Sequence, residues 1–392
     1  MIDRYLEKPI IEDVLDKKMV FISGPRQIGK TTIAQKIGTK AFKNYVYLNW
    51  DNRSDRKKIL SHLFPADKQL LIFDEIHKYR SWKNYLKGEY DKYKDEMHFI
   101  VTGSARLDTY RRGGDSLMGR YHFYRLHPLS LAELKNIKIE QRPFHRLNFP
   151  EVSKETKEIF TDLCTFGGFP EIYLKQTHRA LRRWHNERFD RLIREDIRDM
   201  ENLRDISSLQ VLVELLSHRV GSLFSLNSLR EDLQVTHKTV AHWVEILEKF
   251  YYHFRIYPFQ SSFIKSLRKE PKLYVWDWSE IEEESIRFEN LIALHLLKFC
   301  HYLYDRDGYK AQLYYLRDVD QREVDFLVCI KNKPWFSVEV KQKFRDIPSS
   351  VDYFMRKIKI PYNYLVVQEE DIDLIKDTIR IISASKFLGG LV

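Results

Sequence analysis

The sequence predicts an α/β fold for its first third, in which a parallel sheet is covered by helices on both faces. Short apolar runs, which we interpret as buried strands, recur at 19–23, 45–50, 69–74, 97–103 and 121–126. The intervals between them hold amphipathic or polar stretches that are long enough for the crossover helices that parallel strands need. This alternation is typical of a parallel sheet that is buried on both faces.

The composition limits the classes of protein to consider. The 392 residues are too many for one ordinary core, so we expect two to four domains. Hydrophobic residues make up 43% of the chain, which is ample for burial and excludes a disordered tail protein. The formal net charge of +10 suits a polyanionic partner, nucleic acid above all, although a merely soluble basic surface explains the charge equally well.

The cellular setting follows from the cysteines and from the absence of a long apolar run. Three scattered cysteines form neither a disulfide framework nor a zinc cluster, and they fit a reducing cytosol. The first ten residues carry charges where a signal peptide is apolar, and no run reaches membrane-spanning length. We therefore expect a cytoplasmic protein without a membrane partner.

A glycine-rich stretch, GPRQIGKTT, lies between the first predicted strand and a predicted helix. It fills the pattern G-x-x-x-x-G-K-[ST], in which the glycines let backbone N–H groups turn around a phosphate and the helix N-terminus adds positive potential. Lys30 is expected to reach the β- and γ-phosphates, and Thr31 is expected to bind Mg²⁺. The predicted nucleotide-binding residues are Gly24, Pro25, Arg26, Gln27, Ile28, Gly29, Lys30, Thr31 and Thr32.

Polar residues also end the third and fourth apolar runs. Asp74 is expected to hold the outer shell of the magnesium ion, and Glu75 is expected to polarise the attacking water. Asp74 could cap a helix at the same time. Ser104, or Thr102 as second choice, could hydrogen-bond the γ-phosphate or the water, and an ordinary turn at the end of the strand is an equally good interpretation.

Five stretches together resemble a known family: GPRQIGKTT, LLIFDEIHK, TGSARL, LMGRYHFYRLHPLSLAEL and FGGFPE. They are similar to prokaryotic AAA+-type ATPases that carry a C-terminal domain of the DUF4143 type, and the resemblance extends over nearly the whole chain. It implies an ASCE-type P-loop fold with an added helical lid. It also implies ATP rather than GTP, since no guanine-reading N-K-x-D is present. Arg120 is then the first candidate for an arginine finger and Arg106 the second, and a surface ion pair is the alternative for either.

A polar stretch with two prolines around 138–156 predicts the end of the ATPase core, which we place at 1–150. A helical lid is expected at 151–205. A winged helix-turn-helix is expected at 206–280, because a helical pattern, a short turn, a second helical pattern and a strand-like pattern follow one another there. His237, Lys238 and their neighbours begin the second of these helices, where a DNA reader faces the groove. Many winged helices only pack or bind protein, so DNA contact stays open.

The last domain, 281–392, is predicted to be an α/β domain that resembles the PD-(D/E)xK, or restriction-endonuclease-like, fold. Asp325 lies on one predicted strand, and Glu339 and Lys341 lie on one face of the next. Two carboxylates and a lysine on one face can hold Mg²⁺ and position a water for phosphodiester hydrolysis, and Glu289 matches the usual helical glutamate of that fold. Val324 departs from the pattern, which has proline there. A cross-strand salt bridge that includes Lys341 is the alternative interpretation.

These features together predict an ATPase whose nucleotide state is transmitted to a nuclease-like domain. The expected cofactors are ATP and Mg²⁺, and nucleic acid is the preferred partner. One alternative is an ATP-dependent switch that binds a protein partner without cutting anything. Another is a DNA-remodelling motor whose C-terminal domain only grips DNA. A homo-oligomer is compatible with each of these readings.

Overall fold

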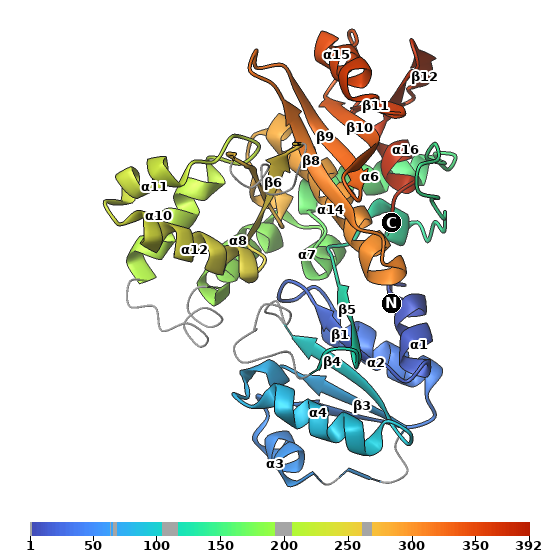
Figure 1. Cartoon of the computed structure of the whole chain (residues 1–392), viewed down its shortest axis with the longest axis vertical. Helices are drawn as coiled ribbons and strands as arrows, with labels where there is room; N and C mark the ends of the chain where they lie inside the picture. The colour runs from blue at the N-terminus through green and yellow to red at the C-terminus, as the bar shows by residue number, and fades with distance from the viewer. Residues whose placement is uncertain (1, 63, 66–68, 104–116, 193–205, 261–268) are drawn as a thin grey trace. The chain divides into compact units, whose positions relative to one another are not determined.

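The computed structural model describes residues 2–62, 64–65, 69–103, 117–192, 206–260 and 269–392 (Figure 1). The chain divides into two compact units, Asp3–His127 and Pro128–Val392. Each unit has its own apolar core. Among the residues described, no helix combines the length and the apolar character that a membrane span requires.

The first unit is built on a five-stranded sheet whose strands match the five apolar runs of the sequence. The strands are β1 (Met19–Ser23), β2 (Tyr45–Asn49), β3 (Leu70–Asp74), β4 (His98–Gly103) and β5 (Tyr121–Arg125). They lie in the order β2-β3-β4-β1-β5, and every pairing is parallel. The predicted α/β fold with a parallel sheet is confirmed, and β4 separates β1 from β3 as in an ASCE-type sheet.

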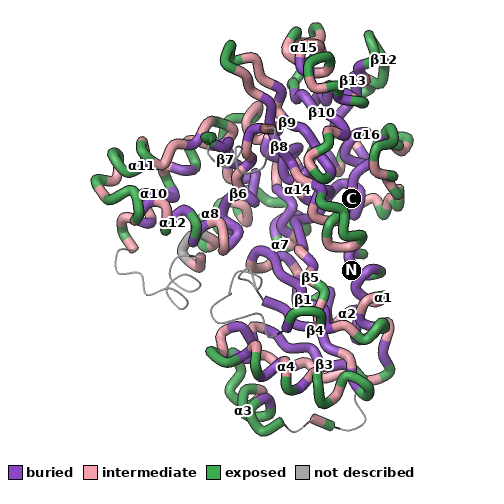
Figure 2. The backbone as a smooth tube through the Cα atoms, in the orientation of Figure 1, coloured by how far each residue is buried: buried purple, intermediate pink, exposed green. Residues whose placement is uncertain are grey.

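Helices cover both faces of this sheet. They are α1 (Glu7–Leu15), α2 (Lys30–Ala41), α3 (Arg53–Ser61) and α4 (Trp82–Tyr93), with a 3-10 turn η1 (Ile76–Lys78). Phe21 and Phe73 share a core with Trp82 of α4. Because side chains alternate along a strand, Ile22 and Ile72 face the other way, and they are fully buried on the side where α1 and α2 contact the sheet. Figure 2 shows the buried strands and the exposed outer sides of the helices.

The second unit contains an eight-stranded mixed sheet in the order β12-β13-β11-β10-β9-β8-β6-β7. Its strands are β6 (His253–Pro258), β7 (Lys272–Val275), β8 (Ala311–Arg317), β9 (Glu323–Ile330), β10 (Lys333–Lys341), β11 (Tyr362–Val367), β12 (Asp373–Lys376) and β13 (Ile379–Ser383). The three strands β8, β9 and β10 form an antiparallel meander, and β11 lies parallel to β10. Three helices accompany this part of the chain: α14 (Glu284–Asp307), α15 (Ser349–Ile358) and α16 (Ala384–Gly389).

Helices precede this sheet in the chain. They are α5 (Leu131–Leu134), α6 (Lys154–Phe166), α7 (Pro170–Lys175), α8 (His178–Arg191), α10 (Ile206–Ser217), α11 (Leu226–Leu233) and α12 (His237–Lys249), with a 3-10 turn η3 (Trp278–Glu280) after β7. The predicted helix, turn and helix are present as α11 and α12, and the Thr236 side chain caps α12 by accepting from the Thr239 N–H. β6 and β7 follow as an antiparallel pair, and β6 continues into the C-terminal sheet by pairing with β8.

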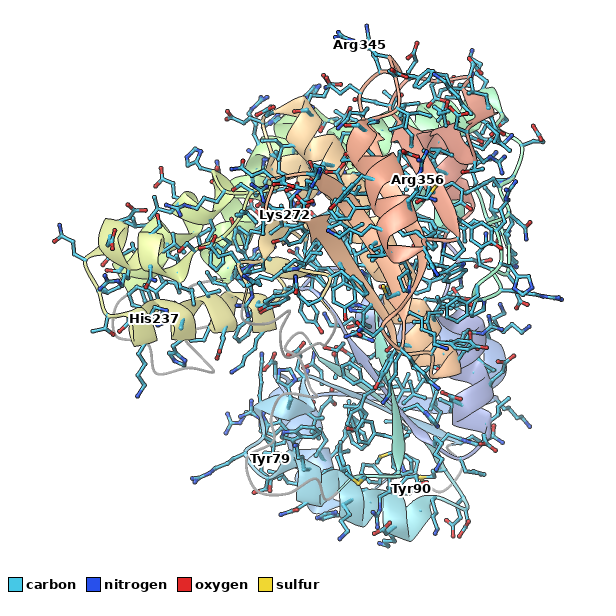
Figure 3. All side chains as sticks on the ribbon, turned by 45° about the horizontal axis from the view of Figure 1, so that its top comes forward. Tyr79, Tyr90, His237, Lys272, Arg345 and Arg356 are labelled. Atoms are coloured by element: carbon cyan, nitrogen blue, oxygen red, sulfur yellow. The ribbon has the colours of Figure 1, made fainter. Side chains whose placement is uncertain are left out.

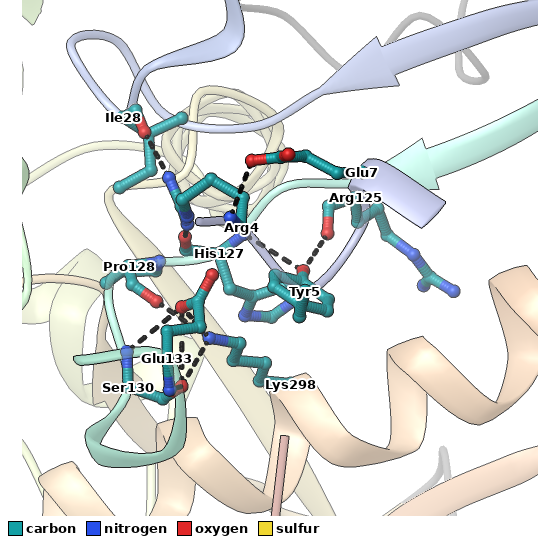
Figure 4. Close-up of polar contacts among 10 residues, drawn as sticks. All are labelled: Arg4, Tyr5, Glu7, Ile28, Arg125, His127, Pro128, Ser130, Glu133 and Lys298. Atoms are coloured by element: carbon teal, nitrogen blue, oxygen red, sulfur yellow. Dashed lines mark hydrogen bonds and ion pairs between the residues drawn. The ribbon is translucent and has the colours of Figure 1, made fainter. Parts of the chain in front are cut away.

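A buried ion pair fixes the start of the second unit onto α14. Lys298 pairs with Glu133 and donates a hydrogen bond to Ser130 Oγ, with 2.8 Å between the two atoms (Figure 4). Ser130 and Glu133 also form the capping box that begins α5. A buried charge pair of this kind needs every hydrogen bond it can make, and here the lysine has three oxygen partners. The four-domain division at 150, 205 and 280 stays a prediction, and the division between the two compact units falls at 127/128.

Candidate nucleotide site and carboxylate cluster

The glycine-rich loop connects β1 to α2 and depends on two glycines. A Cβ atom on Gly24 would overlap the carbonyl oxygen of Leu126, so no other residue fits there. Gly29 is the N-cap of α2 and has a φ of 95°, a conformation that L side chains rarely adopt. Between them lie Pro25, Arg26, Gln27 and Ile28, and Thr32 is exposed on the first turn of α2. The strand, loop and helix order predicted around this motif is present.

Lys30 points into the loop. Its Nζ donates hydrogen bonds to the carbonyl oxygens of Gly24 and Pro25, at 3.1 Å and 2.7 Å, and the residue is only 7% exposed. Arg4, which the sequence analysis missed, braces the same loop: it donates to the carbonyl of Ile28, at 2.9 Å, and to that of His127 (Figure 4). A lone arginine near the N-terminus gives no sequence signal for such a role.

Asp74 joins the loop to the end of β3. Its Oδ2 accepts hydrogen bonds from Thr31 Oγ1, at 2.8 Å, and from the Tyr47 hydroxyl, at 2.6 Å. Its Oδ1 accepts from Thr102 Oγ1. Burial raises the pKa of Tyr47 well above its usual range, and its hydrogen bond to Asp74 adds to this effect, so the phenol stays a donor. The two predicted magnesium-site residues, Thr31 and Asp74, are therefore in direct contact, and Thr102 lies beside them.

Glu75 occupies an unusual backbone conformation at the start of η1. Its φ is 56°, which is uncommon for a residue other than glycine and is frequent at functional sites. Burial raises the pKa of its carboxyl, although the charge of Lys30 opposes the shift. Its Oε2 lies 3.4 Å from Nε2 of His77, and burial lowers the pKa of this histidine to about 3, so the ring is neutral. A carboxylate with a raised pKa suits a general base, which works best when its pKa approaches the working pH.

The structure does not place the other predicted nucleotide-site residues beside the glycine-rich loop. Arg120 makes a two-bond ion pair with exposed Asp91, at 2.8 Å and 3.1 Å. It precedes β5, which runs parallel to β1, so it lies at the sheet edge opposite Ser23 and the loop, about 16 Å away along the strands. The surface ion pair named as the alternative is what the structure contains. Ser104 and Arg106 lie outside the described residues.

The second predicted site is a convergence of side chains in the C-terminal sheet. The Val340 N–H donates to Asp325 Oδ2 at 2.9 Å, and Lys341 Nζ lies 2.8 Å from Glu339 Oε1. Glu339 Oε2 also accepts from the Asp325 N–H, at 3.4 Å. Glu289 of α14 belongs to the same group through the residues of β7 described next. We call Glu289, Glu323, Asp325 and Glu339 the carboxylate cluster.

Lys272 of β7 lies within the carboxylate cluster, and the sequence analysis missed it. Its Nζ contacts Glu323 Oε1 at 2.5 Å, Glu289 Oε1 at 3.5 Å and Asp325 Oδ1 at 3.8 Å. Tyr274, two residues further along the same strand, donates its hydroxyl hydrogen bond to Glu289 at 2.7 Å. Lys272 is 4% exposed, so these carboxylates are its surroundings. β7 reaches the cluster through its pairing with β6 and through α14, whose Asn290 side chain exchanges two hydrogen bonds with the Val275 backbone, each at 2.8 Å.

Burial is the largest cause of the raised pKa values in the cluster, and neighbouring carboxylates add to it. Burial raises the pKa of Glu339 to about 8 and that of Glu289 to about 7, and the Asp325 carboxylate adds to both shifts. Burial by itself would lower the pKa of Lys272, but the surrounding carboxylates reverse this and raise it. The lysine is therefore charged at every physiological pH.

The nuclease resemblance implies a divalent metal ion among Glu289, Asp325 and Glu339. In the part of the chain that the structure describes, no group of three or more His, Cys, Asp or Glu side chains is arranged to hold one. The Lys272 ammonium stands among the carboxylates that would supply the ligands. As folded, the cluster does not fit a metal ion.

The start of α12 presents polar side chains to solvent. Thr236, His237, Lys238 and His242 are exposed, and Figure 3 shows His237 projecting from the helix. The opposite side of the helix is buried, as the apolar spacing predicted, through Trp243, Ile246, Leu247 and Phe250.

Comparison with protein families divides the chain into three parts. An AAA domain matches residues 16–135, a domain of unknown function (DUF8612) matches 157–279, and a domain of unknown function (DUF4143) matches 286–387. Two proteins of Methanocaldococcus jannaschii are similar over most of the chain. Uncharacterized protein MJ1544 is 25% identical over 86% of this chain and 77% of its own length, and uncharacterized protein MJ1637 is 24% identical over 76% and 70%.

Among solved structures, the chain is similar to the Thermotoga maritima RuvB Holliday junction branch migration motor. The match has 20% identity and a TM-score of 0.31 and covers 65% of this chain and 90% of that one. With a TM-score this low, the fold assignment rests on the strand order of the sheet and on the geometry of the glycine-rich loop.

Proposed function

We propose that this chain binds and hydrolyses ATP with Mg²⁺, and that its nucleotide state controls how its C-terminal half acts on nucleic acid. The proposal rests on the match of an AAA domain to residues 16–135 and of a DUF4143 domain to residues 286–387. The observation that carries the first part is the contact of Thr31 with Asp74 beside a lysine that points into the loop.

Each residue of the nucleotide site has a role in this proposal. Lys30 exchanges its bonds to the loop carbonyls for bonds to the β- and γ-phosphates, and the loop N–H groups and the α2 N-terminus hold the same charge. Thr31 would ligate Mg²⁺ and Asp74 would hold its outer shell, and the ion would neutralise charge on the phosphates. Glu75 accepts the proton of the attacking water. Arg120, if it acts as an arginine finger, acts on the nucleotide of a second copy, since it lies far from its own loop.

Nucleic acid is the preferred partner because of charge and of the exposed face of α12. The chain has a formal net charge of +10, and His237, Lys238 and His242 are exposed on a helix that follows a short turn. Such a helix is the reading element of helix-turn-helix proteins. In this form of the proposal the C-terminal half binds nucleic acid without cutting it.

Metal-dependent phosphodiester cleavage is the second candidate function. The convergence of Asp325, Glu339 and Lys341 on neighbouring strands favours it. The position of Lys272 opposes it, because a metal ion would have to compete with an ammonium that is already bound to the carboxylates. If cleavage occurs, it should require Mg²⁺ or Mn²⁺ and be lost in D325A, which leaves the ATPase domain unchanged.

One assay separates these forms of the proposal. The ATP hydrolysis rate is measured with and without double-stranded and single-stranded DNA, and the DNA is recovered and examined for nicks. Stimulation without nicks supports the binding form, and nicks that D325A abolishes support the cleaving form. A rate that no nucleic acid changes, together with an absence of binding, supports the switch with a protein partner.

A further inference from the structure

The carboxylate cluster has a cation of its own. Three of its four members, Glu289, Glu323 and Asp325, contact Lys272 Nζ, at 3.5 Å, 2.5 Å and 3.8 Å. The fourth, Glu339, pairs with Lys341 instead. The two lysines differ in their surroundings: the Lys272 side chain is 5% exposed, whereas the Lys341 side chain is 47% exposed. Lys272 is thus the buried centre of the cluster, and Lys341 lies at its rim.

The strand that carries Lys272 is held in place on several sides. Lys272 pairs with Ile256 in the antiparallel β6–β7 pair and forms a bridge with Leu223. Its ammonium lies 5.9 Å from the centre of the Tyr315 ring on β8, and Tyr274 anchors the same strand face to Glu289. β7 is the edge strand of the sheet. The ammonium is therefore placed by β6, β8 and α14 together, and the carboxylates come from α14, β9 and β10.

We propose that Lys272 is the resident cation of the carboxylate cluster, takes the place of the divalent metal ion that a nuclease-like domain would use, and keeps such ions out of the folded chain. A lysine ammonium and a hydrated Mg²⁺ both neutralise carboxylates, and an ammonium among the carboxylates disfavours the ion, because the two positive charges repel and compete for the same oxygen atoms. Removal of the ammonium leaves Glu289 and Asp325 without this cation, although Glu323 keeps Arg317 and Glu339 keeps Lys341. The added negative charge is the condition that favours a divalent ion. Lys272 has this role whether the domain cuts nucleic acid or only binds it.

The test compares Mn²⁺ binding by chains that differ at this lysine. All chains carry K30A, so that the nucleotide site contributes equally, and thermal unfolding is followed during a MnCl₂ titration without nucleotide. We expect no change in Tm for K30A and a concentration-dependent rise for K30A/K272M, by mass action on the folded state. K30A/K341M is the matched control: it removes the exposed lysine of the same cluster and should behave as K30A. Addition of D325N to K30A/K272M should reduce the rise.

The outcomes are distinct. A rise in K30A that equals the rise in K30A/K272M would overturn the proposal, because the ion then binds with the lysine in place. No rise in either chain would also overturn it, since Lys272 would then not be what excludes the metal. If K30A/K272M does not fold, Mn²⁺ binding to K30A is measured directly by electron paramagnetic resonance. Stoichiometric binding that D325N removes contradicts the proposal, and absence of such binding supports it.

Discussion

Thr31, on the first turn of α2, donates a hydrogen bond to Asp74 at the end of β3, with 2.8 Å between Oγ1 and Oδ2. These residues are 43 positions apart in the chain. Thr31 follows β1 and Asp74 ends β3, and β4 lies between these two strands in the sheet. Because parallel strands end at the same edge of the sheet, the loop after β1 and the acid after β3 meet there. The contact places a hydroxyl and a carboxylate side by side, which is the pair that a magnesium ion on a nucleotide requires.

Asp74→Asn should raise the Mg²⁺ concentration needed for ATP hydrolysis and lower the maximal rate. The amide keeps the shape of the side chain and can still accept the hydrogen bond from Thr31, but it loses the charge that would hold the outer shell of the ion. Loss of such a partner typically lowers metal affinity or activity by roughly 10- to 100-fold. The measurement is phosphate release as a function of Mg²⁺ concentration. Asp51→Asn, an exposed carboxylate that pairs with Lys78, is the control and should match the unaltered chain.

Lys30→Ala should abolish ATP binding. The variant loses the ammonium that donates to the carbonyl oxygens of Gly24 and Pro25 inside the loop. Fluorescent ATP titration measures the affinity, and a shift of Tm with ATP gives an independent readout. Lys40→Ala removes an exposed lysine from the same helix and should leave binding intact. Binding that survives in K30A would mean that the nucleotide sits elsewhere.

Binding to nucleic acid should depend steeply on salt. Each lysine or arginine that contacts a phosphate releases a counterion, so affinity should fall between low and physiological salt. Lys238→Ala, at the exposed start of α12, should weaken binding on all sequences and reduce the slope against log salt by about 1. Lys249→Ala, at the other end of α12, is the matched control. Absence of binding even at low salt would favour the protein-partner switch.

Stability should fall as the pH decreases below 6.5, and His295 should contribute to the fall. Burial lowers the pKa of His295 from 6.5 to about 4, and Lys298 lowers it further, while the Leu291 carbonyl and Glu133 oppose the shift. Between pH 6.5 and pH 4 the unfolded chain therefore binds more protons than the folded chain. The stability that the neutral ring contributes is complete above pH 6.5 and is lost toward pH 4, by at most about 1.4 kcal/mol per pH unit.

The test replaces the His295 ring with a ring that does not titrate. His295→Phe should lose less stability than the unaltered chain when the pH decreases from 7 to 5, as measured by urea or thermal unfolding at each pH. His237→Phe, an exposed position on α12, should follow the unaltered chain. Parallel curves for all three chains would show that His295 is not held neutral.

The strands and the glycine-rich loop could be predicted because their signals are local. The five apolar runs of the sequence are five strands in the order of a P-loop sheet. The motif GPRQIGKTT forms the loop after β1 and the first turn of α2. The motifs assign both Thr31 and Asp74 to the magnesium site, and the shared carboxyl edge of parallel strands explains why they meet. Glu339 and Lys341 could be placed together because they alternate on one strand.

The residues that the sequence analysis missed act across long separations. Lys272 meets Asp325 because β7 pairs with β6 and is bonded to Asn290 of α14, and no periodicity in these segments predicts those contacts. Arg4 binds the loop through a backbone carbonyl oxygen. Because every residue has such an oxygen, the sequence gives no signal for this contact. The position of Arg120 depends on the direction of β5. Arg120 precedes this strand and so lies at the end of the sheet away from the glycine-rich loop, whereas a residue that follows the strand would lie at the same end as the loop.

The most direct test of the account is the ATP turnover of Glu75→Gln measured beside its ATP affinity. The amide preserves the shape of the side chain on its left-handed backbone but cannot accept the proton of the water. We predict unchanged binding and a loss of turnover of at least about 100-fold, the typical contribution of a general base. Glu96→Gln, an exposed control, should retain both. Hydrolysis by Glu75→Gln at the rate of the unaltered chain would contradict the assignment of the base and, with it, the proposed site.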